Sequence, residues 1–128
     1  MDKYQEIYQD FTQAVSQLEK ALNQPKDEFI RDSAIKRFEI AYDLAWKALK
    51  TYLEAEKGLV CHSPKDCFRQ AYQAEVIDYD EFWLEITDWR NETVHTYNEE
   101  LAEKIYKILP KVLTYFQKLM KELNVNNK

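Results

Sequence analysis

The chain has 128 residues, of which 32% are charged, and its formal net charge is −5. This length suits one domain with a single hydrophobic core, and one Gly and three Pro leave little material for tight turns, so we expect an all-α fold. The acidic balance argues against nonspecific nucleic-acid binding, which depends on clustered Lys and Arg, and leaves room for a basic protein partner.

No apolar run is long enough to span a membrane. Met1, Asp2 and Lys3 lead directly into a periodic helical pattern, which is unlike the layout of a signal peptide. We therefore expect a soluble, cytoplasmic protein.

The first predicted helix covers residues 3–23, and Pro25 ends the pattern because proline disfavours a helical residue before it. Its apolar residues recur at spacings of three and four, which places them on one buried stripe. The stripe contains Tyr4, Ile7, Tyr8, Phe11, Val15, Leu18 and Leu22.

The second predicted helix begins within residues 27–32 and ends at Lys57, where Gly58 supplies a left-handed cap. Its apolar stripe is broad, which is typical of a helix that contacts two or more neighbours. On its surface, Asp43 and Lys47 have the spacing of a helical ion pair.

A third, short helix is predicted from Ser63, the expected N-cap, to about Ala74. Pro64 suits its first position. Tyr72 is expected to be buried on the inner face of this helix.

Two cysteines, Cys61 and Cys67, flank the start of this third helix. With His62 they offer three soft ligands, but a fourth is missing and the spacing matches no common zinc pattern. We expect no metal and no cofactor, and two reduced cysteines with Cys67 partly buried.

The fourth predicted helix has Asp78 as its N-cap, with Glu81 three residues later, and extends to Tyr97. Beside its core stripe lies an aromatic flank around an arginine, which suits either a partner surface or a ligand cleft, although its aromatic residues could also widen the core contact. The flank consists of Trp83, Arg90, Val94 and Tyr97.

The fifth predicted helix starts after Asn98, and Pro110 should kink it without ending its apolar pattern. Residues 124–128 are polar and expected to fray. Together the segments predict a single domain over residues 1–128: an up-and-down bundle of four long helices with one additional short helix.

The segment most suggestive of chemistry is Arg90-Asn91-Glu92-Thr93-Val94-His95-Thr96-Tyr97. Cleavage of RNA at its own 2′-hydroxyl needs a proton acceptor, a proton donor and positive charge beside the phosphate. A histidine exchanges protons near neutral pH, and an arginine offers a planar cation that fits phosphate oxygens without a metal. Tyr97 could stack on a base or present a phenol to a modifying enzyme.

Helix geometry separates these groups. Residues seven apart nearly eclipse, whereas residues five apart diverge by about 140°. Arg90 and Tyr97 should share a face, and His95 should point elsewhere. Either the helix loosens near His95, or the arginine and histidine meet across a two-fold axis with a second copy, which we favour.

The Arg-x4-His-x-Tyr pattern resembles that of HEPN domains, and the final Tyr resembles the HepT subgroup. The resemblance implies a homodimeric, metal-independent RNase toxin in which Arg90 and His95 are catalytic and Asn91 assists. It also implies a minimal nucleotidyltransferase as antitoxin, which adds AMP to Tyr97.

Within the second helix, Arg37-Phe38-Glu39 followed by Trp46-Lys47 and Lys50 resembles the nucleotidyltransferase substrate-binding proteins. This resemblance implies an alternative: a noncatalytic subunit that binds a nucleotide or another substrate for the transferase. Arg37, Lys47 and Lys50 would then contribute to substrate binding, although Arg37 could equally be an ion-pair partner.

A third interpretation makes the chain a helical adaptor with an incidental motif. In that case His95 is solvated, Tyr97 belongs to the core, and Arg90 forms a surface ion pair. Its partner would be Glu85, Asp88 or Glu92.

Overall fold

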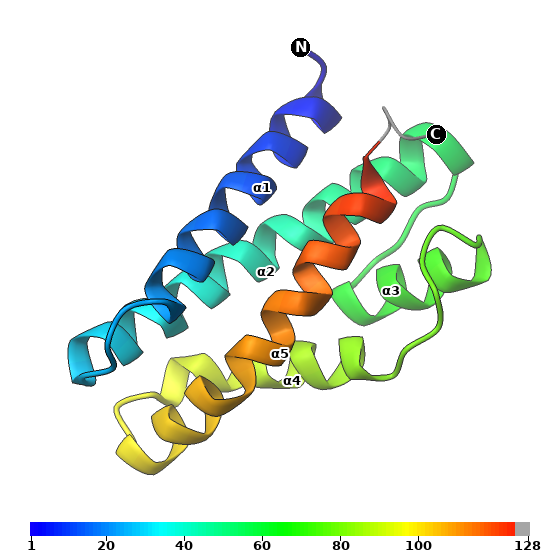
Figure 1. Ribbon diagram of the computed structural model, residues 1–128. Coiled ribbons are helices and arrows are strands. Elements are labelled where there is room, and N and C mark those ends of the chain that lie inside the picture. Colours follow the sequence, from blue (N-terminus) through cyan, green and yellow to red (C-terminus); the bar gives the residue numbers. More distant parts are fainter. Residues whose placement is uncertain (125–128) are drawn as a thin grey trace.

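The computed structural model describes residues 1–124, and over these residues the chain is all-α, with five α-helices (Figure 1). In Figure 1 the chain reverses direction between residues 3–22 and 28–57, and again between residues 82–92 and 99–123. The helices are α1 (Lys3–Leu22), α2 (Glu28–Lys57), α3 (Pro64–Gln73), α4 (Phe82–Glu92) and α5 (Glu99–Leu123), with a 3₁₀ turn, η1 (Thr93–His95), after α4. The predicted frayed tail lies outside the described residues, apart from Asn124.

The predicted number of long helices was wrong by one. The helices α1, α2 and α5 have 20, 30 and 25 residues, whereas α3 and α4 have only 10 and 11. The helix α4 ends at Glu92, five residues before the predicted end, and η1 follows it. The α5 helix is continuous through Pro110, as predicted.

Side-chain caps set most of the helix starts. The Asp27 carboxylate accepts a hydrogen bond from Ile30 N at 2.7 Å, and the Ser63 hydroxyl accepts one from Asp66 N at 3.2 Å. Gly58 closes α2 with φ of 64°, as predicted. The predicted N-cap of α4, Asp78, was wrong, because α4 begins only at Phe82, whose N donates to the Asp80 carboxylate at 2.9 Å; Asp78 pairs with Lys118 on α5 at 2.9 Å.

Aromatic rings fill the centre of the bundle. Phe116 of α5 contacts Phe11 of α1 edge to face, with ring centroids 6.0 Å apart, and stacks on Phe38 of α2 at 6.3 Å. Trp83 belongs to this core and stacks on Phe68 at 4.5 Å, so of the two predicted alternatives for Trp83 the wider core contact is confirmed. Tyr72, predicted as buried, is 46% exposed.

A buried arginine joins the start of α2 to the start of α5. Arg31 is 3% exposed, and its Nη1 donates to Glu99 at 2.6 Å and to Glu103 at 3.1 Å. The bond from Arg31 holds the pKa of Glu99 below the usual value, and bonds from Lys26 and then Arg31 do the same for Glu103. The contact fixes the first turn of α5 directly after the Arg90–Tyr97 segment. Across residues 1–124, we find no helix with the length and apolar character needed to cross a membrane.

Candidate functional site

The predicted motif lies across the end of α4 and the turn that leads into α5. The Asn98 side chain accepts a hydrogen bond from Leu101 N at 3.1 Å and so starts α5, while Asn98 N donates to the His95 carbonyl at 3.0 Å. The Thr96 hydroxyl donates to the Thr93 carbonyl at 3.1 Å. Because side chains and backbone both bond within it, this turn is an ordered segment.

Arg90 is held by a carboxylate of another helix. Its Nε and Nη2 donate to the two oxygens of Asp43 on α2, both at 3.1 Å, and its Nη1 donates to the Thr93 hydroxyl at 3.1 Å. This bidentate geometry fixes the plane of the guanidinium. The hydrogen bonds to Asp43 raise the pKa of Arg90 above its ordinary value, so the group stays charged. The predicted surface partners Glu85, Asp88 and Glu92 were therefore wrong.

The pair with Asp43 leaves part of the guanidinium available. An arginine carries five N–H donors, and Arg90 uses three of them in these contacts. Two remain for an incoming anion. The local positive charge is nevertheless offset by the Asp43 carboxylate.

His95 and Tyr97 face outward on the turn. Tyr97 is 82% exposed, so its predicted alternative place in the core was wrong, and the neighbouring Val94 is exposed as well. The Tyr97 hydroxyl lies 3.4 Å from His95 Nδ1, and the two rings meet edge to face with centroids 6.0 Å apart. This contact uses Nδ1 and leaves His95 Nε2 open to solvent. Asn91 is also exposed.

The helix does change near His95, but the change does not join His95 to Arg90. The hydrogen bonds of Arg90 go to Asp43 and Thr93, and that of His95 goes to Tyr97. A 3₁₀ turn advances by about 120° per residue against about 100° in an α-helix. The tighter turn therefore rotates His95 farther from the Arg90 face.

The candidate substrate-binding residues of α2 are spread along that helix. Arg37 and Lys47 are exposed, whereas Lys50 is half-buried with its Nζ 5.8 Å from the centre of the Trp46 ring. Lys47 lies one turn after Asp43, on the side of α2 from which Asp43 reaches Arg90. Within residues 1–124, Arg37 forms no ion pair.

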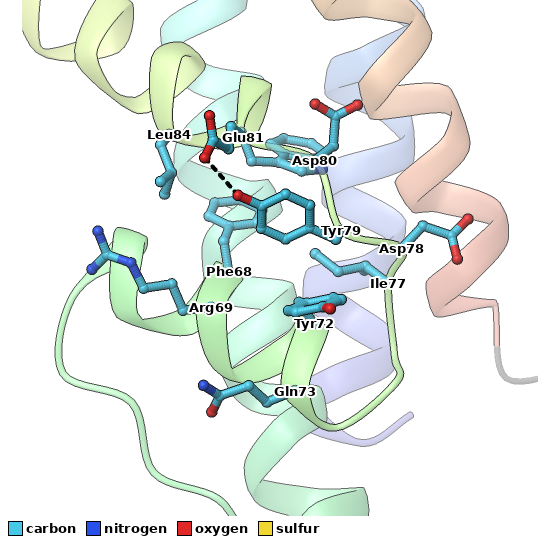
Figure 2. Close-up of a pocket in the computed structure, with 11 residues that line it drawn as sticks. Phe68, Arg69, Tyr72, Gln73, Ile77, Asp78, Tyr79, Asp80, Glu81 and Leu84 are labelled. Carbon is cyan, nitrogen blue, oxygen red and sulfur yellow. Dashed lines mark hydrogen bonds between the residues drawn. The ribbon is translucent and has the colours of Figure 1, made fainter.

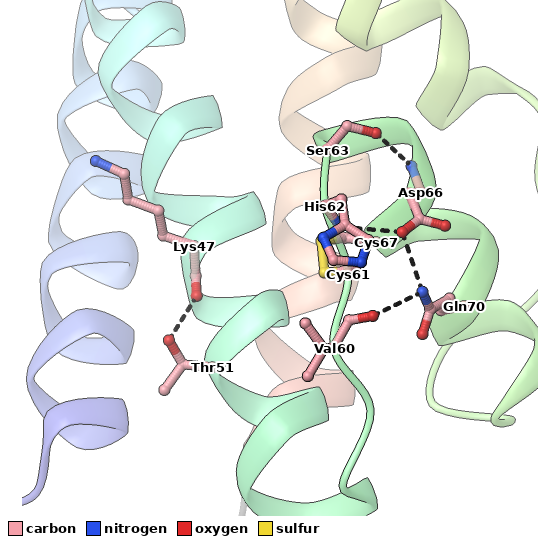
Figure 3. The surroundings of a disulfide bond; sticks show 9 residues. All are labelled: Lys47, Thr51, Val60, Cys61, His62, Ser63, Asp66, Cys67 and Gln70. Atoms are coloured by element: carbon pink, nitrogen blue, oxygen red, sulfur yellow. Dashed lines mark hydrogen bonds between the residues drawn. A yellow bond between two sulfur atoms is a disulfide. The ribbon is translucent and has the colours of Figure 1, made fainter.

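The prediction of two reduced cysteines was wrong. Cys61 and Cys67 form a disulfide with a Cα–Cα distance of 5.1 Å, and both residues are buried (Figure 3). A bonded pair cannot ligate a metal as thiolates. His62 N donates to Asp66 at 3.0 Å. No group of three or more His, Cys, Asp or Glu in the described part of the chain could hold a metal ion.

Sequence reasoning did not identify Asp43 and Thr93 as the residues that orient Arg90. The sequence showed Asp43 only as a partner for Lys47 one turn away, a local pairing that the contact with Arg90 replaces. Asp43 is half-buried near the middle of α2, and its role could be identified only once the packing of α2 against α4 is known.

Comparison with known proteins identifies relatives over most of the chain. Residues 6–125 match the family described as "Nucleotidyltransferase substrate binding protein like". A protein of Haemophilus influenzae named "Probable ribonuclease HepT" is 30% identical over 98 residues, which cover 73% of this chain and 67% of that protein.

Two solved structures have the same fold. A crystal structure from Thermus thermophilus has a TM-score of 0.84 at 33% identity and covers 89% of this chain and 98% of its own. A Haemophilus influenzae structure, described as revealing the fold of a substrate binding domain of a nucleotidyltransferase, has a TM-score of 0.70 at 26% identity. It covers 94% of this chain and 96% of its own.

Proposed function

Because this chain belongs to the nucleotidyltransferase substrate-binding protein-like family and is a HepT-like homologue, we propose that it is the HEPN subunit of a two-component system. Its partner is a minimal nucleotidyltransferase that acts as antitoxin. Its own activity is metal-independent cleavage of RNA. The observation that carries this proposal is the exposed pair of His95 and Tyr97 on the turn that follows an oriented Arg90 in the chain.

The chemistry assigns a role to each group. His95 accepts the proton of the RNA 2′-hydroxyl, the 2′-oxygen bonds to phosphorus, and the bond from phosphorus to the 5′-oxygen breaks. The imidazolium of His95 then gives this proton to the leaving oxygen. Arg90 stabilises the crowded phosphate with its two remaining N–H groups, and the Asn91 amide assists by hydrogen bonding. The product is a 2′,3′-cyclic phosphate.

The dimer follows from the divergence of Arg90 and His95 in one chain. In our proposal each site combines the guanidinium of one copy with the imidazole of the other. Sedimentation should give twice the chain mass of 15.4 kDa. Mixing inactive Arg90→Ala and His95→Ala chains should restore part of the activity, since one of two sites is then complete; no recovery in mixed dimers would contradict a shared site.

The chain has two histidines, which supply a matched control. We expect wild type and His62→Ala to arrest growth and cleave RNA in a host that lacks the partner, because His62 lies exposed in the link before α3. His95→Ala should do neither. Equal growth and equal RNA integrity for all three proteins would refute the RNase proposal.

The exposed Tyr97 phenol is the proposed acceptor of AMP. Co-expression with the partner transferase should add one or more AMP groups to the intact mass of wild type and none to Tyr97→Phe. Tyr79→Phe is the control, since Tyr79 is another exposed tyrosine and lies beyond the other end of α4. Equal AMP addition to Tyr97→Phe and to wild type would exclude Tyr97.

One observation favours the alternative, a noncatalytic subunit that binds a nucleotide for the transferase. Asp43 occupies two N–H groups of Arg90 and reduces the positive charge that a phosphate transition state needs. This alternative predicts nucleotide binding by calorimetry without turnover, weakened in Arg37→Ala and Lys47→Ala. It fails if the purified protein degrades RNA in a His95-dependent way.

A further inference from the structure

A pocket of about 350 Å³ lies between α3, the link after it and the first turn of α4 (Figure 2). This volume is within the range of small-ligand sites. The pocket lies near Phe82 at the start of α4, whereas the Arg90–Tyr97 segment begins near its end, about 12 Å along the helix axis. It is lined by Phe68, Arg69, Tyr72, Gln73, Ile77, Asp78, Tyr79, Asp80, Glu81, Trp83 and Leu84.

The pocket presents aromatic rings to solvent. Tyr72 and Tyr79 meet edge to face with centroids 4.9 Å apart, and Tyr79 is 59% exposed. The stacked Phe68 and Trp83 rings line it from the core side. Exposed ring faces carry partial negative charge and attract cations.

Two carboxylates of the lining accept hydrogen bonds from neutral donors. Glu81 Oε1 accepts the Tyr79 hydroxyl at 2.7 Å, and Asp80 accepts Phe82 N at 2.9 Å together with the Tyr115 hydroxyl. In the described chain, neither carboxylate forms an ion pair. Glu81 Oε2 has no hydrogen-bond partner there either. Lys111 and Lys118 attract the Asp80 carboxylate and lower its pKa, after the hydrogen bond from Tyr115, so the Glu81 carboxylate is the negative charge that persists beside the rings.

The other charges of the lining do not cancel this effect. Asp78 is paired with Lys118 of α5 at 2.9 Å. Arg69 is the cation of the lining, and Figure 2 shows its guanidinium extending away from the Tyr72 and Tyr79 rings. An anionic ligand against these rings would therefore meet the Glu81 carboxylate without a compensating cation.

We propose that this pocket binds a planar organic cation of the amidinium or guanidinium class. The flat cation packs against the Tyr72 and Tyr79 rings, and its N–H groups donate to Glu81. The net charge of −5 favours its approach. The site is separate from the proposed RNase centre, so either can fail without the other.

Benzamidine and benzamide are matched probes, because they share a shape and differ in charge. Titration followed by amide NMR shifts should show binding of benzamidine at least about tenfold tighter than that of benzamide, with shifts at Tyr72, Tyr79 and Glu81. AMP, which is planar but anionic, should not compete. Equal affinity for the two probes, or competition by AMP, would overturn the proposal.

Variants of exposed residues test the contacts with little risk to the fold. Glu81→Gln and Tyr72→Ala should each weaken benzamidine binding by about tenfold. Tyr79→Phe should retain binding, because the ring remains. Glu100→Gln, at the exposed start of α5, is the charge control and should bind as wild type does. Unchanged affinity in Glu81→Gln with a native circular dichroism spectrum would refute the assigned contact.

The cation has two possible sources, which a further arm separates. A capped tripeptide with a central arginine that binds more tightly than benzamidine assigns the pocket to an arginine side chain of a protein. The reverse order assigns it to a free small molecule. Either order of affinity supports a pocket for a planar organic cation, and failure of both the tripeptide and benzamidine to bind would refute it.

Discussion

The contact between Arg90 and Asp43 should stabilise the fold measurably. Its two hydrogen bonds join α4 to α2 at 3.1 Å each, and the side chains are 23% and 41% exposed. Exposed ion pairs contribute about 0.2–1 kcal/mol, and hydrogen bonds to charged groups about 1.5–3 kcal/mol. A bidentate, half-exposed pair should lie between these limits, at about 1–2 kcal/mol. For a chain of this length that energy corresponds to roughly 5 °C in Tm.

The assay is a double-mutant cycle in urea with Asp43→Ala, Arg90→Ala and the double variant. The control cycle uses Lys65 and Asp88, a single 2.8 Å contact between side chains that are 37% and 64% exposed. We expect a coupling energy of about 0.5 kcal/mol or less there. A coupling energy for Asp43 and Arg90 no larger than in the control would refute the bidentate contact as a determinant of stability.

Three further predictions concern the scaffold. The pKa of Glu99 lies below its ordinary value of 4.5. The stability from its contact with Arg31 is therefore present above pH 4.5 and is lost as the pH falls below it. In Arg31→Met, the free energy of unfolding should depend less on pH between about pH 5 and pH 3 than it does in wild type. Replacing Cys61 and Cys67 by Ala should cost about 2 kcal/mol in urea unfolding, the closure entropy of this short loop, and reductant should then have no further effect. Gly58→Ala should cost about 1 kcal/mol from its φ of 64° alone, since an added Cβ meets nothing within 4 Å; a loss below about 0.3 kcal/mol would contradict this.

Local chemistry explains which parts of the fold were predictable. The apolar spacing predicted five helices, and the caps at Ser63 and Gly58 were found because each acts within a few residues of itself. Asp78 failed as a cap because α4 begins only at Phe82, and its carboxylate instead pairs with Lys118, 40 residues later. A cap formed by neighbours can be predicted from neighbours, whereas a competing long-range partner requires the packed bundle.

The same distinction applies to the candidate site. The spacing of the motif residues could be read from the sequence, but no Gly or Pro marks the end of α4 at Glu92. The carboxylate that orients Arg90 lies 47 residues earlier. The disulfide was missed because composition indicates only the usual redox environment of such chains. It does not show that the Cα atoms of Cys61 and Cys67 lie 5.1 Å apart.

The link between Arg90 and α2 also limits what the motif can do by itself. Asp43 fixes the guanidinium against the bundle and uses the donors on one side of it, so an anion must approach from the side of the two remaining N–H groups. His95 lies beyond a 3₁₀ turn that rotates it away from that approach, and its Nδ1 already faces Tyr97. On one copy, the oriented Arg90 guanidinium and the exposed His95 imidazole therefore lie at different points of the surface. In the proposed RNase, a second copy joins the two at one phosphate, and for this reason the mixing of Arg90→Ala with His95→Ala chains tests the proposal more directly than either variant alone.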